Sequence, residues 1–324
     1  MTSRPLDRAF ALEAVRVTEA AAIAASEQIG RGNEHAADHA AVEAMRTAFN
    51  SLPISGTVVI GEGERDEAPM LYIGEKVGSG GLAIDIALDP LEGTTLTAKA
   101  LSNALAVMAM AEPGTLLNAP DTYMDKIAIG GGYPDGLIDL DADPKENIFA
   151  LARAKGVKPR EITACIMDRP RHDKLIAAVR EAGAAVRLIT DGDVAGVIAT
   201  SDPATGIDIY IGIGGAPEGV LAAAALRCVG GQIQTRLVFR NDSERERAAK
   251  LGIKDLKRKY SLMDMASGDV VFAATGVTDG SMLEGVHKSG NFIMTESVVM
   301  RSATGTVRWI KARHVRSRHL KDES

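Results

Sequence analysis

Apolar residues recur at helical spacing in the first part of the chain. The segment 8–28 is rich in alanine, and Leu12, Val15 and Ile23 share one helical face. Two glycines follow this segment and are predicted to end the helix. The pattern of residues 35–49 predicts a second helix. The chain is therefore expected to begin with two helices joined by a glycine-containing turn.

Short apolar runs of strand length follow these helices. They predict strands at residues 56–61, 82–88, 104–110 and 126–129. The second of these runs is expected to stop at Asp89-Pro90. We expect the four strands to belong to one sheet.

The pattern changes after about residue 160. Strands and helices are then predicted to alternate, with strands at 162–167, 186–190 and 207–213 and helices at 171–182, 194–200 and 218–228. Such alternation predicts a parallel sheet with right-handed crossovers, whose ligands bind at the carboxyl ends of its strands. We therefore predict two domains, residues 1–160 and 161–324. Two further predicted strands, 292–300 and 306–310, could belong to either domain.

The composition excludes several classes of protein. A net charge of -6 over 324 residues argues against a nucleic-acid-binding protein, which would normally carry a basic surface. Two cysteines without a CxxC motif favour a reducing compartment, and no apolar run is long enough to span a membrane. The segment 212–215 has only part of a dinucleotide-binding pattern, so no nucleotide cofactor is predicted. We expect a soluble cytoplasmic protein.

The segment Asp89-Pro90-Leu91-Glu92-Gly93-Thr94-Thr95 is the strongest chemical signal in the sequence. A buried strand is predicted to deliver two carboxylates to a turn, and Thr94 is predicted to open a helix. Hard divalent cations prefer oxygen ligands, so the two acids are candidate metal ligands. The alternative is a strand end with two solvated acids, followed by a capped helix.

Further acidic residues follow predicted strands or lie on a predicted helix. Glu62 and Glu64 alternate with glycines after the first strand, which a solvated turn also explains. Asp38 lies within the second predicted helix, where an ordinary exposed acid is the alternative. Pro217 and Glu218 lie between a strand and a helix, and both residues suit a helix start.

Several segments together resemble class II fructose-1,6-bisphosphatase, a member of the lithium-sensitive phosphatase superfamily. The resemblance covers about residues 8–315 and rests on Gly30-Arg31-Gly32 with Asp38, and on residues 60–64, 66–72, 89–94 and 214–219. It implies an α/β fold of layered α-β-α-β-α sugar-phosphatase architecture, with a mixed N-terminal sheet and a parallel C-terminal sheet. The first domain would then bind metal and the second the sugar phosphate.

The resemblance also implies roles for individual residues. The metal ligands, for two or more Mn²⁺ or Mg²⁺ ions, would be Asp38, Glu62, Asp89, Glu92 and Glu218. The catalytic residues would be Thr94, Glu62 and Asp89, with Thr94 orienting or deprotonating the attacking water. Substrate contacts would come from Glu92, Gly93 and Thr94, from Tyr123, Arg169 and Arg171 at the distal phosphate, and from Asp191, Asp193 and Gly215 at the sugar hydroxyls.

Residues of the second domain also fit purely structural roles. Arg169 and Arg171 suit a helix start followed by a solvated turn. Tyr123 suits a packed core aromatic, and Asp193 suits a helix cap. One departure from the family pattern is the absence of a lysine shortly before Asp38, where the sequence reads Asn33-Glu34-His35. This difference bears on metal preference, pH optimum and sensitivity to monovalent ions.

The implied reaction is metal-dependent hydrolysis of the 1-phosphate of fructose 1,6-bisphosphate, in gluconeogenesis or Calvin-type sugar phosphate metabolism. Three alternatives are a bifunctional enzyme that also acts on sedoheptulose 1,7-bisphosphate, an inositol monophosphatase-like enzyme and a non-catalytic sugar-phosphate sensor. The resemblance implies a homodimer or homotetramer, with no nucleic-acid or membrane partner.

Overall fold

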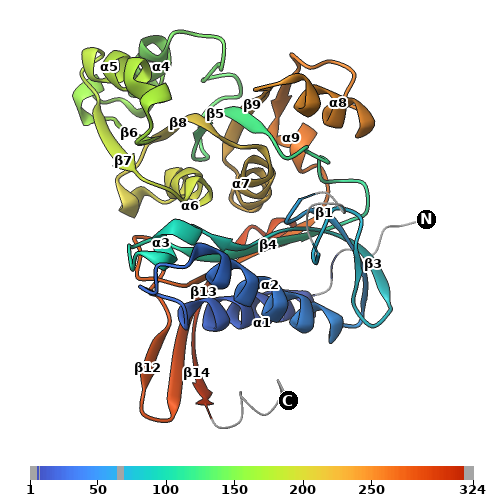
Figure 1. Cartoon of the computed structure of the whole chain (residues 1–324). Helices are drawn as coiled ribbons and strands as arrows, with labels where there is room; N and C mark the ends of the chain where they lie inside the picture. The colour runs from blue at the N-terminus through green and yellow to red at the C-terminus, as the bar shows by residue number, and fades with distance from the viewer. Residues whose placement is uncertain (1–5, 7, 64–68, 317–324) are drawn as a thin grey trace. The chain divides into compact units, whose positions relative to one another are not determined.

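The computed structural model describes residues 6, 8–63 and 69–316 of the chain. The chain divides into two compact units, residues 1–114 with 269–324 (unit 1) and residues 115–268 (unit 2). Each unit has its own sheet, as Figure 1 shows. The boundary predicted near residue 160 therefore lies inside unit 2, and the chain returns to unit 1 after residue 268.

Unit 1 contains an eight-stranded sheet in the order β12-β13-β11-β4-β3-β1-β2, with β14 paired to β13. β1 and β3 are parallel neighbours, and the other pairs are antiparallel, so the sheet is mixed as predicted. Its strands are β1 (Ile54–Ile60), β2 (Lys76–Val77), β3 (Leu82–Glu92), β4 (Leu105–Ala111), β11 (Val270–Gly276), β12 (His287–Ser289), β13 (Phe292–Arg301) and β14 (Thr306–Val315).

The helices α1 (Ala9–Ser26) and α2 (Glu34–Asn50) confirm the two helices predicted at the start of the chain. Both contribute to one apolar core with the sheet, which includes Val17 and Phe49 from the helices and Ile84 and Ile86 from β3. Alanines of α1 and α2 are fully buried there, and their small side chains let the helices approach closely. The short helix α3 (Thr94–Ala98) follows β3 directly.

Unit 2 contains a six-stranded sheet in the order β10-β9-β5-β8-β6-β7. Its strands are β5 (Tyr123–Ile129), β6 (Thr163–Met167), β7 (Ala185–Ile189), β8 (Ile209–Gly215), β9 (Gln232–Val238) and β10 (Lys259–Ser261). Its α-helices are α4 (Pro144–Lys155), α5 (Asp173–Glu181), α6 (Asp193–Ile198), α7 (Ala216–Val229), α8 (Asp242–Lys250) and α9 (Leu262–Met265).

Helices pack on both faces of this second sheet (Figure 1). Residues of α4 and α5, including Ile148 and Val179, share a core with Ile127 of β5. On the opposite face, Gly196 of α6 lies against Cys165 and Tyr210, and α7 also packs there. The side chains that alternate along β5 are therefore directed toward two different helical layers.

The second sheet is mixed, which corrects the prediction of a parallel sheet. β6, β7 and β8 are parallel, as the alternation of strands and helices predicted. β5 lies between β8 and β9 and is antiparallel to both, and β10 is antiparallel to β9. The predicted crossovers among β6, β7 and β8 are therefore present, and β5, which comes earlier in the chain, pairs with β8 at the edge of this parallel group.

Two further expectations about strands are wrong. β4 belongs to the sheet of unit 1 and β5 to that of unit 2, so the four early strands do not share one sheet. β3 does not stop at Asp89-Pro90 but continues to Glu92, with a register shift that lets Pro90 occupy an irregular part of the ladder. The last two predicted strands, β13 and β14, belong to unit 1.

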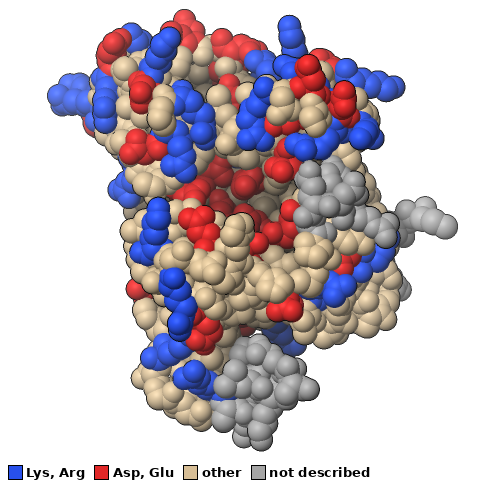
Figure 2. Space-filling view, in the orientation of Figure 1, with Lys and Arg blue, Asp and Glu red and all other residues tan. Residues whose placement is uncertain are grey.

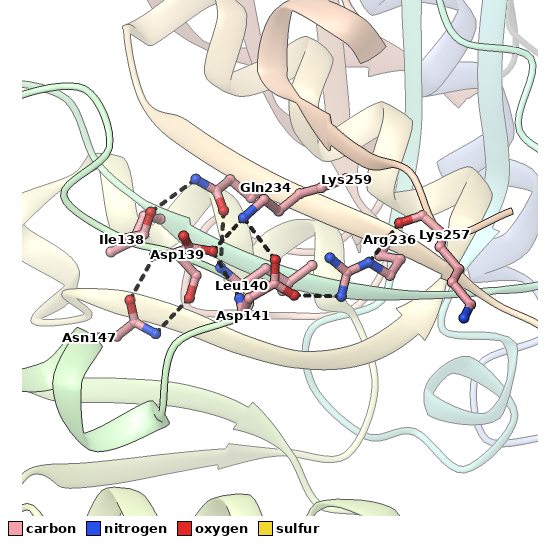
Figure 3. Close-up of polar contacts among 9 residues, drawn as sticks. All are labelled: Ile138, Asp139, Leu140, Asp141, Asn147, Gln234, Arg236, Lys257 and Lys259. Carbon is pink, nitrogen blue, oxygen red and sulfur yellow. Dashed lines mark hydrogen bonds and ion pairs between the residues drawn. The ribbon is translucent and has the colours of Figure 1, made fainter. Parts of the chain in front are cut away.

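Charged side chains of both signs occur on the face of the molecule seen in Figure 2. On this face, lysines and arginines of the described residues form no continuous basic surface. Figure 3 shows one such arrangement in unit 2, where Lys259 contacts Asp139 and Asp141, and Arg236 also contacts Asp141. No helix within the described ranges is long and apolar enough to cross a membrane.

Candidate active-site residues in the two units

Acidic residues of unit 1 lie at or near the carboxyl ends of two neighbouring parallel strands. Ile60 of β1 is paired with Ala87 of β3, and Glu62 and Asp89 each lie two residues beyond this pair. The carboxyl ends of parallel neighbours meet at the same edge of a sheet. The strand pairing therefore brings the predicted Glu62 and Asp89 to one edge, as the sequence pattern suggested.

A bulge separates the two acids of β3. Asp89 is paired with Val107 and Glu92 with Leu105, so β3 has one residue more than β4 over this interval. Asp89 Oδ1 accepts a hydrogen bond from the Leu91 N–H at 3.0 Å, which stabilises the local turn of the chain. Glu92 is almost fully buried, with 4% of its surface exposed. An acid buried to this degree is not a solvated strand-end residue.

Gly93 joins β3 to α3 in a left-handed conformation, with φ at +95°. A Cβ atom at this position would lie 2.8 Å from Leu96 Cδ1, so both the backbone angle and the close packing require glycine. Gly93 is the N-cap of α3, and Thr94 is the first helical residue. Thr94 therefore does not occupy the capping position that a purely structural role would give it.

Asp38 lies on α2, which packs against both β3 and α3. Burial raises the pKa of its carboxyl, while His35 and His39 act in the opposite direction. The turn before α2 is fastened to α3, because the N–H groups of Gly30 and Gly32 donate to carbonyls of α3 at 2.9 Å. Asp38 is therefore a partly buried acid on a helix that packs against β3 and α3.

Asn33 caps α2 by accepting a hydrogen bond from the Ala36 N–H at 3.0 Å. This residue and exposed His35 occupy the stretch where the family pattern has lysine. The second acidic segment is described only in part. The Glu62 N–H donates to the Leu71 carbonyl at 3.1 Å, whereas Glu64 and residues 66–68 lie outside the described residues.

In unit 2, two glycines at the end of β8 make room for carboxylates. A Cβ atom on Gly214 would collide with the Asp193 carboxylate, and one on Gly215 would collide with that of Glu218. Asp193 is the first residue of α6 but does not cap it, because Gly192 is the N-cap. Instead, Asp193 Oδ2 accepts a 2.6 Å hydrogen bond from Lys126 Nζ, and both side chains are buried.

Glu218 lies in the first turn of α7. Burial raises the pKa of Glu218 to about 7, nearby Asp193 adds to this effect, and Lys126 opposes it. Its Oε2 atom is buried and accepts no hydrogen bond from the described residues. A buried carboxylate oxygen of this kind is suited to a hard cation, as is the all-oxygen character of the predicted ligand set.

The predicted phosphate-binding residues of unit 2 form two groups of contacts. Arg171 Nε and Nη2 donate to the Ile213 carbonyl at 3.2 and 2.7 Å, and the Arg171 guanidinium lies 5.0 Å from the centre of the Tyr123 ring. Arg169 Nη2 lies 4.0 Å from Asp191 Oδ1. Tyr123 is half-buried and pairs with Gly215 across β5 and β8. These contacts bring Arg171, Tyr123 and Gly215 together, with Arg169 beside Asp191.

His172 supports the acceptor that holds Arg171. Its Nδ1 lies 2.8 Å from the Met167 carbonyl, and its Nε2 accepts a 2.8 Å hydrogen bond from the Ile213 N–H. These contacts fit a neutral imidazole with its proton on Nδ1. Burial lowers the pKa of His172, in agreement with a neutral ring.

Sequence reasoning missed two cations of unit 2. Lys126 is fully buried beside Asp193, and the Arg240 guanidinium lies 4.6 Å from the centre of the Tyr123 ring. A lysine within an apolar strand was an available signal for Lys126. Nothing local marked Arg240, because its neighbour Tyr123 lies more than a hundred residues earlier in the sequence.

The structure does not by itself define a metal centre. Among residues 6, 8–63 and 69–316, no three histidine, cysteine or acidic side chains are grouped so that they could hold a metal ion. The assignment of Asp38, Glu62, Asp89, Glu92 and Glu218 as metal ligands therefore stays a prediction.

Carboxylates at strand ends and arginines beside glycine-rich turns, in an α/β protein, are the parts of an enzyme that hydrolyses phosphate esters. Residues 8–314 match the family described as bacterial fructose-1,6-bisphosphatase, glpX-encoded. Fructose-1,6-bisphosphatase 1 class 2 of Escherichia coli K12 is 46% identical over 321 residues, covering 95% of each chain. Class 2 enzymes of E. coli O6:H1 and Shigella flexneri match to the same extent. The chain belongs to the bacterial class 2 fructose-1,6-bisphosphatase family.

Proposed function

We propose that this protein hydrolyses the 1-phosphate of fructose 1,6-bisphosphate and releases fructose 6-phosphate and inorganic phosphate. The observation that carries the proposal is the match to the family over residues 8–314. The chemistry of the residues in both units supports it. The reaction belongs to the class of phosphoric monoester hydrolysis.

The proposed reaction depends on Mn²⁺ or Mg²⁺. Asp38, Glu62, Asp89, Glu92 and Glu218 would hold two or more ions. When bound, such ions lower the pKa of a water molecule and neutralise the phosphoryl oxygens and the leaving alkoxide. The buried Oε2 of Glu218 and the bulge that separates Asp89 from Glu92 support these assignments.

Thr94 is proposed to orient the attacking water. A threonine hydroxyl is a poor base, so Thr94 would pass the proton of the water to a neighbouring carboxylate, with Glu62 and Asp89 as candidates. Its position directly after Gly93, at the first residue of α3, supports this role because Gly93 already serves as the N-cap. The backbone at Glu92, Gly93 and Thr94 would contact the phosphate that reacts.

The remaining substrate contacts are proposed for unit 2. Arg169, Arg171 and Tyr123 would bind the phosphate that does not react, because guanidinium groups bind phosphate through paired hydrogen bonds. Asp191, Asp193 and Gly215 would contact the sugar hydroxyls. Lys126 would hold one oxygen of Asp193, and this orients the carboxylate for a hydroxyl donor.

The deciding experiment is phosphate release from a panel of substrates with Mn²⁺ and with Mg²⁺. We expect the highest kcat/KM for fructose 1,6-bisphosphate. Sedoheptulose 1,7-bisphosphate and inositol 1-phosphate are the comparison substrates. A higher kcat/KM for inositol 1-phosphate, or no turnover of any member of the panel, would exclude the proposed function.

We also infer that the protein forms a homodimer or homotetramer, as the family resemblance implies. Light scattering on the purified full chain measures the mass directly. A mass of 34.0 kDa at assay concentration would identify a monomer and contradict this inference.

A further inference from the structure

Two arginines from distant parts of unit 2 lie over the ring of Tyr123. The guanidinium carbon of Arg171 lies 5.0 Å from the ring centre, and that of Arg240 lies 4.6 Å from it. Arg171 follows β6, whereas Arg240 lies between β9 and α8. An aromatic ring attracts each cation, but two like charges beside one ring repel each other. An anion bound near both guanidinium groups would remove this repulsion.

Both arginines are held along the same edge of the guanidinium group. Arg171 donates through Nε and Nη2 to the Ile213 carbonyl. Arg240 donates through Nε to Glu244 Oε1 at 2.6 Å, and its Nη2 forms an ion pair with the same oxygen at 2.6 Å. Within the described residues, Nη1 of neither arginine makes a hydrogen bond. Each side chain is therefore fixed in position and keeps donors for a further acceptor.

The anchor of Arg240 is a buried acid. Glu244 is only 1% exposed and accepts hydrogen bonds from the Arg240 N–H at 2.7 Å and the Thr122 hydroxyl at 2.8 Å. Burial opposes its ionisation, but these hydrogen bonds outweigh burial and hold the pKa of Glu244 below its usual value. An ionised Glu244 fixes both the backbone and the side chain of Arg240, so little conformational entropy is lost when Arg240 binds a ligand.

The two arginines at Tyr123 differ in their direct partners, and Asp121 also acts on Arg240. Arg171 has a carbonyl as its partner and Arg240 has the carboxylate of Glu244. The contrast is the network of Figure 3, where two cations, Arg236 and Lys259, contact two acids, Asp139 and Asp141. Each cation of that network pairs with an acid, whereas Arg171 makes no ion pair with any described residue.

We propose that Arg240 is a second arginine that, together with Arg171 and Tyr123, binds the phosphate of the substrate that is not hydrolysed. This inference rests on the proposed function and extends it, because Arg240 would determine the preference for a bisphosphate over a monophosphate. Arg240 is placed to bind this group and takes no part in the bond cleavage. Its loss should therefore weaken binding of sugars that carry this phosphate and leave fructose 1-phosphate, which lacks it, little affected.

The test uses the full-length protein with Arg240→Ala and Arg240→Lys, assayed on fructose 1,6-bisphosphate and on fructose 1-phosphate. Arg240→Ala should raise KM for the bisphosphate roughly 10-fold or more, the size expected for a lost charged hydrogen bond. kcat/KM for fructose 1-phosphate should change less than about twofold, because that substrate lacks the second phosphate. Arg240→Lys should recover part of the loss, since it keeps the charge.

Arg245→Ala is the matched control. Arg245 is an exposed arginine of α8 that contacts Phe239 and Asp242 instead of Tyr123, so its removal should leave both substrates unaffected. An unchanged KM of Arg240→Ala for the bisphosphate would overturn the inference. Equal losses of kcat/KM for fructose 1,6-bisphosphate and fructose 1-phosphate would also overturn the inference, because they would assign Arg240 to folding alone.

A binding measurement separates this inference from the proposed function. Calorimetric titration with fructose 6-phosphate needs no turnover, and wild-type protein should bind it roughly 10-fold more tightly than Arg240→Ala does. Absence of turnover with this difference in affinity would reject the enzymatic function and retain the phosphate site. If the protein turns over the bisphosphate but wild type and Arg240→Ala bind fructose 6-phosphate with equal affinity, the function is retained and the role of Arg240 is rejected.

Discussion

Both units contribute acids to the predicted site residues, but only unit 2 contributes arginines. In unit 1, Glu62 follows β1, and Asp89 and Glu92 lie in the last part of β3. None of the site residues predicted in unit 1 is an arginine. In unit 2, Arg171 and Arg240 lie over Tyr123. Carboxylates suit cations and arginines suit phosphate oxygens. On the proposed assignments, unit 1 together with Glu218 would provide the chemistry, and unit 2 would provide most of the affinity.

A kinetic distinction follows from this difference in charge. Residues that act on the water and the reacting phosphoryl group should change kcat, because they stabilise the transition state. Residues that hold a phosphate distant from the reaction should mainly change KM, provided that its binding energy is equal in the ground and transition states. Metal removal and single substitutions in each unit therefore test whether the two units divide the work in this way.

Removal of metal should have the largest effect. The acids of unit 1 and Glu218 cannot polarise water by themselves, so treatment with a chelator should abolish phosphate release, and added Mn²⁺ or Mg²⁺ should restore it. The melting temperature should rise on addition of metal, since a ligand that binds only the folded state stabilises it. Full turnover by metal-free protein would end the assignment of unit 1 to metal-assisted chemistry.

Thr94→Ala should lower kcat by roughly 10²-fold or more, the scale of general acid–base catalysis, and leave KM nearly intact. Thr94→Ser should retain measurable activity because the hydroxyl survives. Single-turnover rate and melting temperature are measured on the same preparations. A less stable Thr94→Ala protein that turns over at the wild-type rate would assign Thr94 to helix stability instead.

Arg171→Ala should raise KM for fructose 1,6-bisphosphate roughly 10- to 100-fold, with a smaller change in kcat. Arg169→Ala should act in the same direction, and less strongly because Arg169 does not contact Tyr123 in the structure. Exposed Arg187 of β7 provides the control substitution. The division between the units fails if Arg171→Ala lowers kcat alone.

Asp125 provides a test of stability on the sheet of unit 2. Burial raises the pKa of Asp125 to about 6, nearby Asp141 adds to the rise, and the Lys126 N–H and Arg236 oppose it. A raised pKa means that the folded state holds the proton more tightly. This stabilising contribution is complete below about pH 4 and is lost as the pH rises through about 6.

Asp125→Asn should prevent this loss of stability at high pH, because the amide does not ionise. The variant should be more stable than wild type at pH 8 by up to about 3 kcal/mol, and the difference should shrink toward pH 4. Chemical denaturation at several pH values measures it. A constant difference between the two proteins from pH 4 to pH 8 would show that Asp125 titrates normally.

Lys259→Ala should have the smallest effect. Its ion pairs with Asp139 and Asp141 are largely exposed, and such pairs contribute about 0–1 kcal/mol each. The free energy of unfolding should therefore fall by about 0–1 kcal/mol for each ion pair lost, and KM and kcat should stay at wild-type values. A change in KM comparable to that of Arg171→Ala would show that the balanced network of Figure 3 also serves substrate binding.

The sequence alone determined the class of fold and most helices and strands. Helical periodicity predicted α1 and α2, and the alternation of strands and helices predicted the parallel strands β6, β7 and β8. These features depend on local spacing, which a sequence displays directly. The segment 89–94 was equally visible, because its acids, glycine and threonine are neighbours in the chain.

Only the tertiary structure decided which distant segments lie together. Local pattern does not reveal that β5 separates β8 from β9, that Lys126 meets Asp193 or that Arg240 reaches Tyr123. Strand partners and ion pairs of this kind depend on the packing of a whole unit, since many registers satisfy the same local periodicity. The acidic residues were therefore found from their sequence neighbours, and the second arginine at Tyr123 required the folded chain.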